Sequence, residues 1–235
     1  MRTFAILMLV AGLAQAETNL DARALLERVV ANRAMKDFAL KGRLSANRDQ
    51  SVIIEVLVKN TPAETRTIYR AATNEVLIVQ PVRGETRYFL GGAKRTARFL
   101  GSEFTYYDLG LPFLHWQDPK YVGEDRVRGR DCQVVEVRAA SEPYSRVKMW
   151  IDQEYFALLR AEAFDADDGL VKRFAISSFK RIGEVWIPRG IEAATVLSQQ
   201  ALPAEEKSRL EIYEGNYDAR LPAEWFAEER FGGAR

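Results

Sequence analysis

The sequence predicts a mainly β protein. We expect a strongly curved, incomplete antiparallel β-barrel of about eleven strands, with an N-terminal helix and a helical, aromatic lid. Three observations lead to this prediction. Apolar residues alternate with polar ones along most of the chain after residue 37, turn residues separate the alternating segments at short intervals, and one long aromatic segment interrupts the pattern at residues 91–118. Consecutive antiparallel strands in such number must either curl into a barrel-like sheet or split into a sandwich.

The first residues have the features of a secretory signal peptide. Arg2 is followed by an apolar run at residues 4–13 and by Ala14-Gln15-Ala16, a small-x-small cleavage site. The run is too short to span a bilayer of roughly 30 Å, and a buried helix would need a cap and a polar face that it lacks. We therefore predict a signal peptide at residues 1–16 and a single domain at residues 17–235. Because no cysteine follows the cleavage site, we expect a soluble protein without a lipid anchor.

Composition excludes some classes of function. The formal net charge of +1 gives no sign of a nucleic-acid footprint. Cys132 is the only cysteine, so no intrachain disulfide can form, and its neighbours in CQVVEV predict a buried small hydrophobe in preference to a redox thiol. The stability of the fold must therefore come from a large core.

Residues 21–35 have the period of a helix. Their apolar residues recur along one helical face, and Asp21 is placed to cap the N-terminus of the helix through its carboxylate. Beyond this segment the period changes to two, which predicts strands. We predict about eleven strands from thirteen alternating segments, which are 38–45, 52–59, 64–71, 75–80, 85–90, 120–127, 131–139, 146–152, 158–164, 170–179, 185–187, 191–197 and 207–217.

The segment at residues 91–118 has no alternation of strand length. Ser102 or Thr105 could cap a short helix that contains residues 106–109. A long insertion of this kind in a compact domain is usually functional or disordered, and its aromatic content argues against disorder. Two interpretations remain open: a lid that closes an apolar cavity on the concave face, or a plug that fills the sheet as core. The aromatic residues of the segment are Phe99, Phe104, Tyr106, Tyr107, Phe113 and Trp116.

No motif predicts catalysis. His115 is the only histidine, and it lies among aromatic residues, which favours a packed or lining role. The chain has no G-x-S-x-G motif and no glycine-rich phosphate loop, and although Asp and Glu are plentiful, no pair of carboxylates stands out. The acidic residues 165–169 do not have EF-hand spacing, so we predict that Asp168-Gly169 forms a two-residue hairpin turn. We expect no enzyme, no catalytic residue, no metal site and no cofactor.

Several short stretches, taken in order, resemble the LolA/LolB-like family of periplasmic lipoprotein carriers. The resemblance is greatest to the branch of outer-membrane lipoprotein-sorting proteins, and it covers nearly all of the chain after residue 16. The family's arginine beside a turn proline is absent, because Lys59-Asn60-Thr61-Pro62 occupies that position, so no residue role is taken from that motif. The stretches are EVLIV at 75–79, GET at 84–86, YFL at 88–90, GSEFTYYDL at 101–109, WID at 150–152, DG at 168–169 and WIP at 186–188.

The resemblance implies a periplasmic carrier that shields acyl chains of lipoproteins, or free lipids, for transfer toward the outer membrane. Its partners would be the acylated or lipid cargo, an inner-membrane transporter and an outer-membrane acceptor. An alternative is a lipoprotein-sensing or accessory binding module of an envelope membrane-protein complex, and a hydrolase ranks third. The residues that we predict to contact lipid are Ile54, Val56, Tyr69 and Trp150 in the cavity and Phe104, Tyr106, Tyr107, Leu109, Phe113 and Trp116 in the lid.

Overall fold

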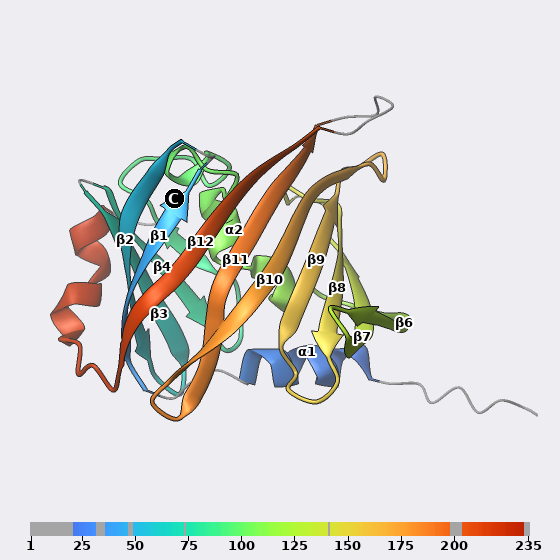
Figure 1. Cartoon of the computed structure of the whole chain (residues 1–235), viewed down its shortest axis with the longest axis horizontal. Helices are drawn as coiled ribbons and strands as arrows, with labels where there is room; N and C mark the ends of the chain where they lie inside the picture. Colours follow the sequence, from blue (N-terminus) through green and yellow to red (C-terminus); the bar gives the residue numbers. More distant parts are fainter. Residues whose placement is uncertain are drawn as a thin grey trace, which may run out of the picture.

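A single twelve-stranded sheet dominates the computed structural model (Figure 1). The structure describes residues 21–31, 36–46, 49–72, 74–140, 142–197 and 204–232. The predicted signal peptide at residues 1–16 lies outside these ranges. All paired strands are antiparallel and the sheet is not closed, so the predicted class, an incomplete and curved antiparallel barrel, is confirmed.

The elements follow the sequence prediction closely. The strands are β1 (Phe38–Ser45), β2 (Ser51–Asn60), β3 (Glu64–Ala71), β4 (Asn74–Pro81), β5 (Arg87–Phe89), β6 (Lys120–Val127), β7 (Arg130–Arg138), β8 (Arg146–Asp152), β9 (Leu158–Phe164), β10 (Leu170–Ile182), β11 (Val185–Leu197) and β12 (Ala204–Tyr217). The helices are α1 (Ala22–Ala31) and α2 (Tyr106–Leu109), and the 3₁₀ turns are η1 (Phe99–Gly101), η2 (Pro112–His115), η3 (Ala223–Phe226) and η4 (Glu228–Phe231).

The order of the strands explains why the barrel stays open. The sheet runs β5-β4-β3-β2-β1-β12-β11-β10-β9-β8-β7-β6, so β1 pairs with β12 in its middle while β5 and β6 form its two edges. The chain leaves the sheet at one edge and must re-enter it at the other. Residues 90–119 make this connection, and Figure 1 shows them on the inner side of the curved sheet.

Strand β11 corrects one detail of the prediction. The sequence pattern divides residues 185–197 at Pro188, but the structure has one continuous strand. Pro188 pairs with Phe179 beside two shifts of register between β10 and β11. A proline has no N–H to donate, so a bulge is one of the few places in a sheet that accept it.

Helix α1 begins where the sequence predicts. The Asp21 carboxylate accepts hydrogen bonds from the backbone N–H groups of Arg23 (3.0 Å) and Ala24 (3.2 Å), which have no partner within the helix. Buried Leu25 and Leu26 face the core. The described helix ends at Ala31, and residues 32–35 of the predicted helix lie outside the described residues.

The loop between β9 and β10 is wider than predicted. A two-residue turn at Asp168-Gly169 is wrong, because the strands end at Phe164 and resume at Leu170. The Asp165 carboxylate accepts hydrogen bonds from the backbone N–H groups of Asp167 (3.0 Å) and Gly169 (2.8 Å) and so closes a five-residue loop. Only Asp168 has a positive φ there, of 60°.

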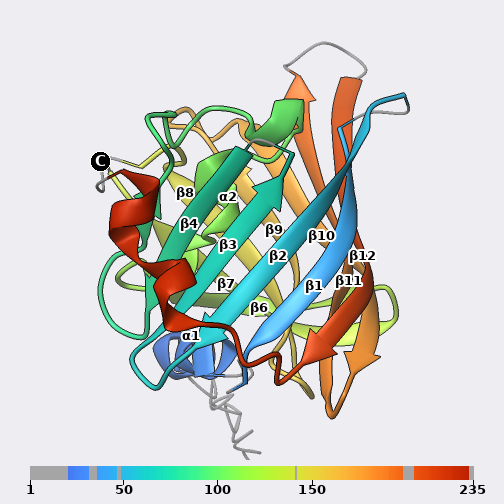
Figure 2. The same cartoon turned by 90° about the vertical axis from the view of Figure 1, so that its left-hand side faces the viewer.

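Strands β2 to β5 are buried on both faces. On the concave face Ile54, Val76 and Ile78 belong to the main core, which also holds the aromatic residues of the crossover segment. On the convex face Leu57, Ile68, Leu77, Val79 and Phe89 pack against Leu221, Phe226 and Phe231 of the C-terminal segment. Figure 2 shows that segment lying over the outside of β3 and β4. This double burial explains the nearly continuous apolar run in β4.

The seam between the first and last strands depends on a glycine. A Cβ at Gly42 would lie 2.7 Å from the Glu211 carbonyl oxygen and 2.9 Å from Ile212 Cδ1, beside a bulge between β1 and β12. The backbone oxygen cannot move away without breaking the seam. Gly42→Ala should therefore lower the free energy of unfolding by about 1–3 kcal/mol, measured by denaturant titration. Arg43→Ala, at the exposed neighbouring position, is the control, and an unchanged midpoint for Gly42→Ala would contradict this account of the seam.

Candidate functional site: an apolar cavity under the curved sheet

A cavity of about 870 Å³ lies between the concave face of the sheet and the pair α1 and η2. Most of its lining is apolar. Strands β1, β2, β11 and β12 contribute Phe38, Leu40, Val56, Val58, Ile187, Ile191, Leu210 and Ile212, and α1 and η2 contribute Val29, Val30, Leu114 and His115. Small-molecule sites occupy roughly 300–1,000 Å³ and are mainly apolar with a few polar groups, so this cavity has the size and the chemistry of a ligand site.

The alternation of the strands places these side chains inward. Phe38 and Leu40 of β1 are separated by Ala39, which packs with the convex cluster. On β2, Val56 and Val58 line the cavity, whereas Leu57 between them belongs to the convex core. Because side chains alternate across a strand, the lining residues of β1 and β2 lie two positions apart and the residue between them faces the other side.

Three polar side chains of the lining, those of Asn60, Thr65 and Gln80, are bonded to one another or to the backbone. Thr65 Oγ1 donates to Asn60 Oδ1 (2.7 Å), and Asn60 Nδ2 donates to the Lys36 carbonyl oxygen (2.8 Å). Gln80 Nε2 donates to the carbonyl oxygen of Gly110 (2.9 Å), just after α2. These bonds satisfy polar atoms that an apolar ligand could not satisfy, so the lining can accept a ligand without leaving them unpaired.

Three aromatic residues of the lining are exposed to solvent, and we call the part of the cavity that they line its mouth. Tyr155, Phe179 and Trp186 are 54%, 37% and 66% exposed, although all three also line the cavity. The Arg130 guanidinium lies 4.8 Å from the centre of the Tyr155 ring and bonds the buried Asp152 carboxylate. Large exposed aromatic side chains at a cavity mouth form a surface that a passing ligand or a partner can cover.

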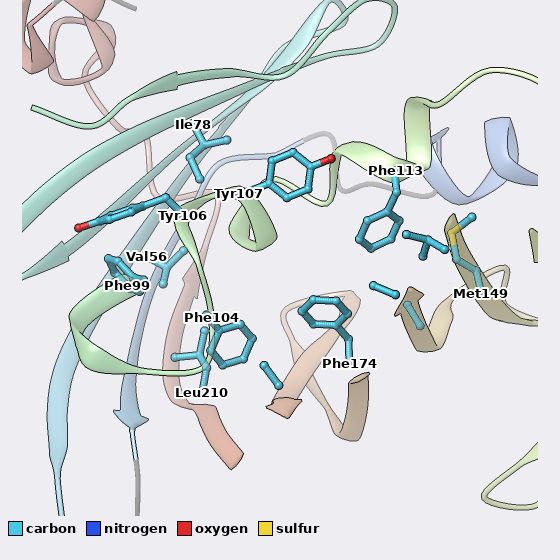
Figure 3. Packing of buried hydrophobic residues seen from close by; sticks show 14 of the residues in the cluster. Val56, Ile78, Phe99, Phe104, Tyr106, Tyr107, Phe113, Met149, Phe174 and Leu210 are labelled. Carbon is cyan, nitrogen blue, oxygen red and sulfur yellow. The ribbon is translucent and has the colours of Figure 1, made fainter. Parts of the chain in front are cut away.

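The aromatic residues of the crossover segment occupy a neighbouring part of the concave face. Phe99, Phe104, Tyr106, Tyr107 and Phe113 are buried in the main core and are not part of the cavity lining (Figure 3). Their rings pack against the sheet and one another. The ring centres are 5.4 Å apart for Phe99–Tyr106, 5.8 Å for Tyr107–Tyr144 and 6.2 Å for Phe113–Phe174. The segment therefore fills one part of the concave face, and the hollow remains beside α1.

Helix α2 is fixed to the sheet by a buried charged network. Thr105 caps the helix as predicted, in a reciprocal capping box with Asp108. The fully buried Asp108 carboxylate also accepts a hydrogen bond from Lys172 Nζ on β10 (2.6 Å) and one from the Tyr144 hydroxyl (2.6 Å). Burial raises the pKa of the Tyr144 hydroxyl, with the Asp108 charge adding to the effect, so the phenol stays a proton donor.

The cavity wall is connected to this segment. The Tyr69 ring lies 5.9 Å from the Phe99 ring, and the Tyr69 hydroxyl lies 3.5 Å from the carbonyl oxygen of Leu109. Burial raises the pKa of Tyr69 to about 12. Together with the bond from Gln80 to Gly110, these contacts join the lining of the cavity to the end of α2.

The predicted contact residues separate into four groups. Val56 and Tyr69 line the cavity. Ile54, Phe104, Tyr106, Tyr107 and Phe113 are buried in the main core, and Leu109 packs against it. Trp116 lines a second, smaller cavity. Trp150 lies in a separate cluster with Cys132, Val134 and Leu159, and its indole N–H donates to Asp125 Oδ2 (2.8 Å).

The position of Trp150 follows from strand parity. Its neighbours Met149 and Ile151 face the main core, so Trp150 must face the opposite side of β8. The prediction that Cys132 is a buried small residue is confirmed, and burial raises the pKa of its thiol.

The sequence prediction missed most of the lining. The inward residues of β1, β11 and β12 were present as alternating apolar positions, but alternation alone does not say which face is concave. Trp186 also had a signal, because an indole beside a strand proline near a turn is hard to bury. Neither α1 nor η2 could be assigned to the cavity without knowing where the crossover lies.

Within the described residues, no helix is both long and apolar enough to cross a bilayer. Over the same ranges, no group of three or more His, Cys, Asp or Glu side chains is arranged to hold a metal ion.

Comparison with known proteins adds fold relatives. Residues 58–232 match a family model described as "Uncharacterized protein". No protein with curated annotation matches the chain significantly. Among solved structures, a DUF1329 family protein from Desulfovibrio piger superposes with a TM-score of 0.73 at 19% identity, with 89% of this chain and 97% of that chain covered.

Two further structures have the same fold. A putative outer membrane lipoprotein-sorting protein domain from Vibrio parahaemolyticus superposes with a TM-score of 0.74 at 14% identity, covering 89% of this chain and 97% of that one. A LolA superfamily protein from Nitrosomonas europaea gives 0.61 at 17% identity, covering 89% and 98%. At these identities the likeness establishes the fold.

The buried network at α2 makes a prediction about stability. Lys172→Met leaves the Asp108 carboxylate buried without its cation, which should lower the free energy of unfolding by about 3–5 kcal/mol in denaturant titrations. Adding Asp108→Asn removes the unpaired charge and should recover a large part of that loss. A double variant no more stable than Lys172→Met would contradict the assignment of an ion pair at this position.

The raised pKa of Tyr69 makes a prediction about pH. The folded state favours the neutral phenol, so its contribution to stability is complete below the ordinary pKa of 10.0 and is lost as the pH rises toward about 12. Tyr69→Phe should remove this dependence. The difference in unfolding free energy between wild type and variant should therefore change between about pH 9 and about pH 11.5. If the difference in unfolding free energy did not change with pH, the pKa of Tyr69 would be the same in the folded and unfolded states.

Proposed function

We propose that this protein, which has the fold of a LolA superfamily protein and belongs to an uncharacterized family whose model matches residues 58–232, is a periplasmic carrier that shields an acyl chain of a lipoprotein or lipid in the cavity under its sheet. The observation that carries the proposal is the apolar hollow of about 870 Å³ on the concave face, with an exposed aromatic mouth. The family's fold and the lining chemistry both support it.

The energetics require an enclosed lining. Moving one methylene out of water is worth about 0.8 kcal/mol, so an acyl chain with roughly 14 of them represents about 11 kcal/mol. An acyl chain that crosses an aqueous space on the protein surface would stay largely in water, and a few surface contacts could not compensate for this unfavourable free energy. A cavity lined from two sides, by the sheet and by α1 with η2, can remove most of a chain from water.

Release requires a competitor for the lining. We assign this role to the crossover segment at residues 90–119, the proposed lid, which already packs on the concave face beside the cavity. Its aromatic side chains could occupy apolar surface that the cargo vacates, which would reduce the free-energy difference between the loaded and empty states. The bond between Gln80 and Gly110 and the contact between Tyr69 and Leu109 offer a route by which a ligand in the cavity would affect the lid.

A second candidate is an accessory binding module of an envelope membrane-protein complex. The observation that favours it is the aromatic mouth, because Trp186 and Tyr155 are more than half exposed. A protein partner could cover this surface, and an inner-membrane transporter or an outer-membrane acceptor would be such a partner. The two candidates differ in whether the cavity holds a ligand.

A cavity-filling substitution tests the proposal. Val58 lines the cavity on β2, so Val58→Phe places a ring where the acyl chain would lie. We expect the affinity for a fluorescent fatty-acid probe to fall about tenfold or more, equivalent to about 1.4 kcal/mol, in fluorescence titrations. The matched control is Val52→Phe, because Val52 lies on the same strand but is exposed and outside the lining. Equal affinity in both variants would exclude this cavity as the binding site.

A further inference from the structure

A second cavity, of about 660 Å³, adjoins the apolar one. Val30, Leu114 and His115 line both cavities, so the two meet at α1 and η2. The rest of the second lining comes from α1, from Pro62 in the turn between β2 and β3, from the turn after β4 and from residues 116–119. Figure 2 shows α1 at the end of the sheet where β2 and β3 are joined. A molecule in the apolar cavity could therefore extend into the second one past three shared side chains.

The two cavities differ in chemistry. The second is lined by two arginines, Arg23 and Arg83, by His115 and by one carboxylate, Glu27. The arginines outnumber the carboxylate, which leaves one formal positive charge before His115 is considered. The second cavity, with its excess positive charge, therefore adjoins the apolar cavity.

The arginines of this cavity are poorly neutralised. Arg83 forms no ion pair with any described residue. By contrast Arg87, four residues later on β5, bonds Glu64 (3.2 Å) and Glu228 (2.8 Å). Among the described residues, Arg23 has an ion pair only with Asp118, at 4.0 Å, and the Asp118 side chain is 97% exposed. An exposed pair at that distance contributes little, so both guanidinium groups keep donors for another anion.

We infer that the second cavity binds the phosphate group of a lipid headgroup whose acyl chain lies in the apolar cavity. This inference rests on the proposed function, and it narrows the cargo to phosphate-bearing lipids. A phosphodiester carries one negative charge, which matches the single excess charge of the two arginines over Glu27. Guanidinium groups pair with phosphate oxygens through two parallel hydrogen bonds, which gives the headgroup a defined position.

The arrangement also predicts selectivity. A neutral lipid with the same chain would gain the apolar burial but not the charge-assisted bonds. The arginines are partly exposed, so the advantage of the charged lipid should decrease with added salt. Free phosphate would gain the bonds but not the burial, so it should bind more weakly than the lipid.

The test compares two lipids with one acyl chain: lysophosphatidylglycerol, with a phosphodiester, and monoacylglycerol, without one. Their affinities are measured by isothermal titration below the critical micelle concentration for wild type, Arg83→Gln, Arg23→Gln and a control, Arg43→Gln. Arg43 is exposed on β1, has no ion pair with a described residue and lines neither cavity, so its variant makes the same charge change elsewhere. A third titrant is inorganic phosphate alone.

We expect wild type to bind the charged lipid about tenfold more tightly than the neutral one, and Arg83→Gln or Arg23→Gln to remove most of that preference. Arg43→Gln should keep it. The headgroup site would be overturned if wild type bound both lipids with equal affinity, or if Arg43→Gln reduced the preference for the charged lipid as much as Arg83→Gln and Arg23→Gln do. Either result would leave the carrier proposal standing.

Two other outcomes are informative. Inorganic phosphate binding as tightly as the charged lipid would overturn the inference in favour of a free-anion site. Failure of both lipids to bind wild type would overturn the carrier proposal, and the headgroup site with it.

Discussion

The two edges of the sheet, β5 and β6, do not pair, and the chain that joins them must cross the concave side. This constraint determines the rest of the structure. A crossover on that side has to be apolar where it meets the sheet, which explains the aromatic residues of a segment that has no strand pattern. It also has to be held in place, and the buried contact of Asp108 with Lys172 and Tyr144 holds α2 against β10 and its neighbours. Where the crossover and α1 leave the sheet uncovered, the apolar cavity remains.

The sequence was sufficient for the elements of the fold because each has a local cause. The period of two gives the strands, the Asp21 carboxylate begins α1, and Thr105, one of the two predicted caps, begins α2. It was not sufficient for the loop at residues 165–169, where side-chain hydrogen bonds of Asp165 decide the width, nor for β11, where a bulge accommodates Pro188. These features depend on contacts between neighbouring segments and not on composition.

The candidate site was harder to predict for a related reason. Alternation identifies two faces of each strand but does not say which face is concave. Val56, Tyr69 and Trp150 were all predicted to line the cavity, but in the structure Val56 and Tyr69 line it, whereas Trp150 lies in a separate cluster. Of the two interpretations of the aromatic segment, the plug describes where its rings lie, because they are buried in the core, and the lid stays a proposal. Its rings fill the middle of the concave face as core, and the hollow that could receive cargo lies beside them, next to a helix whose role no local pattern reveals.

The central claim is that the hollow under the sheet holds an acyl chain in the cell. Native mass spectrometry of the protein, purified without detergent from the envelope fraction of its host, tests this claim most directly. We expect a second population, heavier than the protein alone by the mass of one acylated molecule, which converts to the lighter one after extraction with organic solvent. A single population at the mass of the protein alone, unchanged after incubation with lipid vesicles, would contradict it.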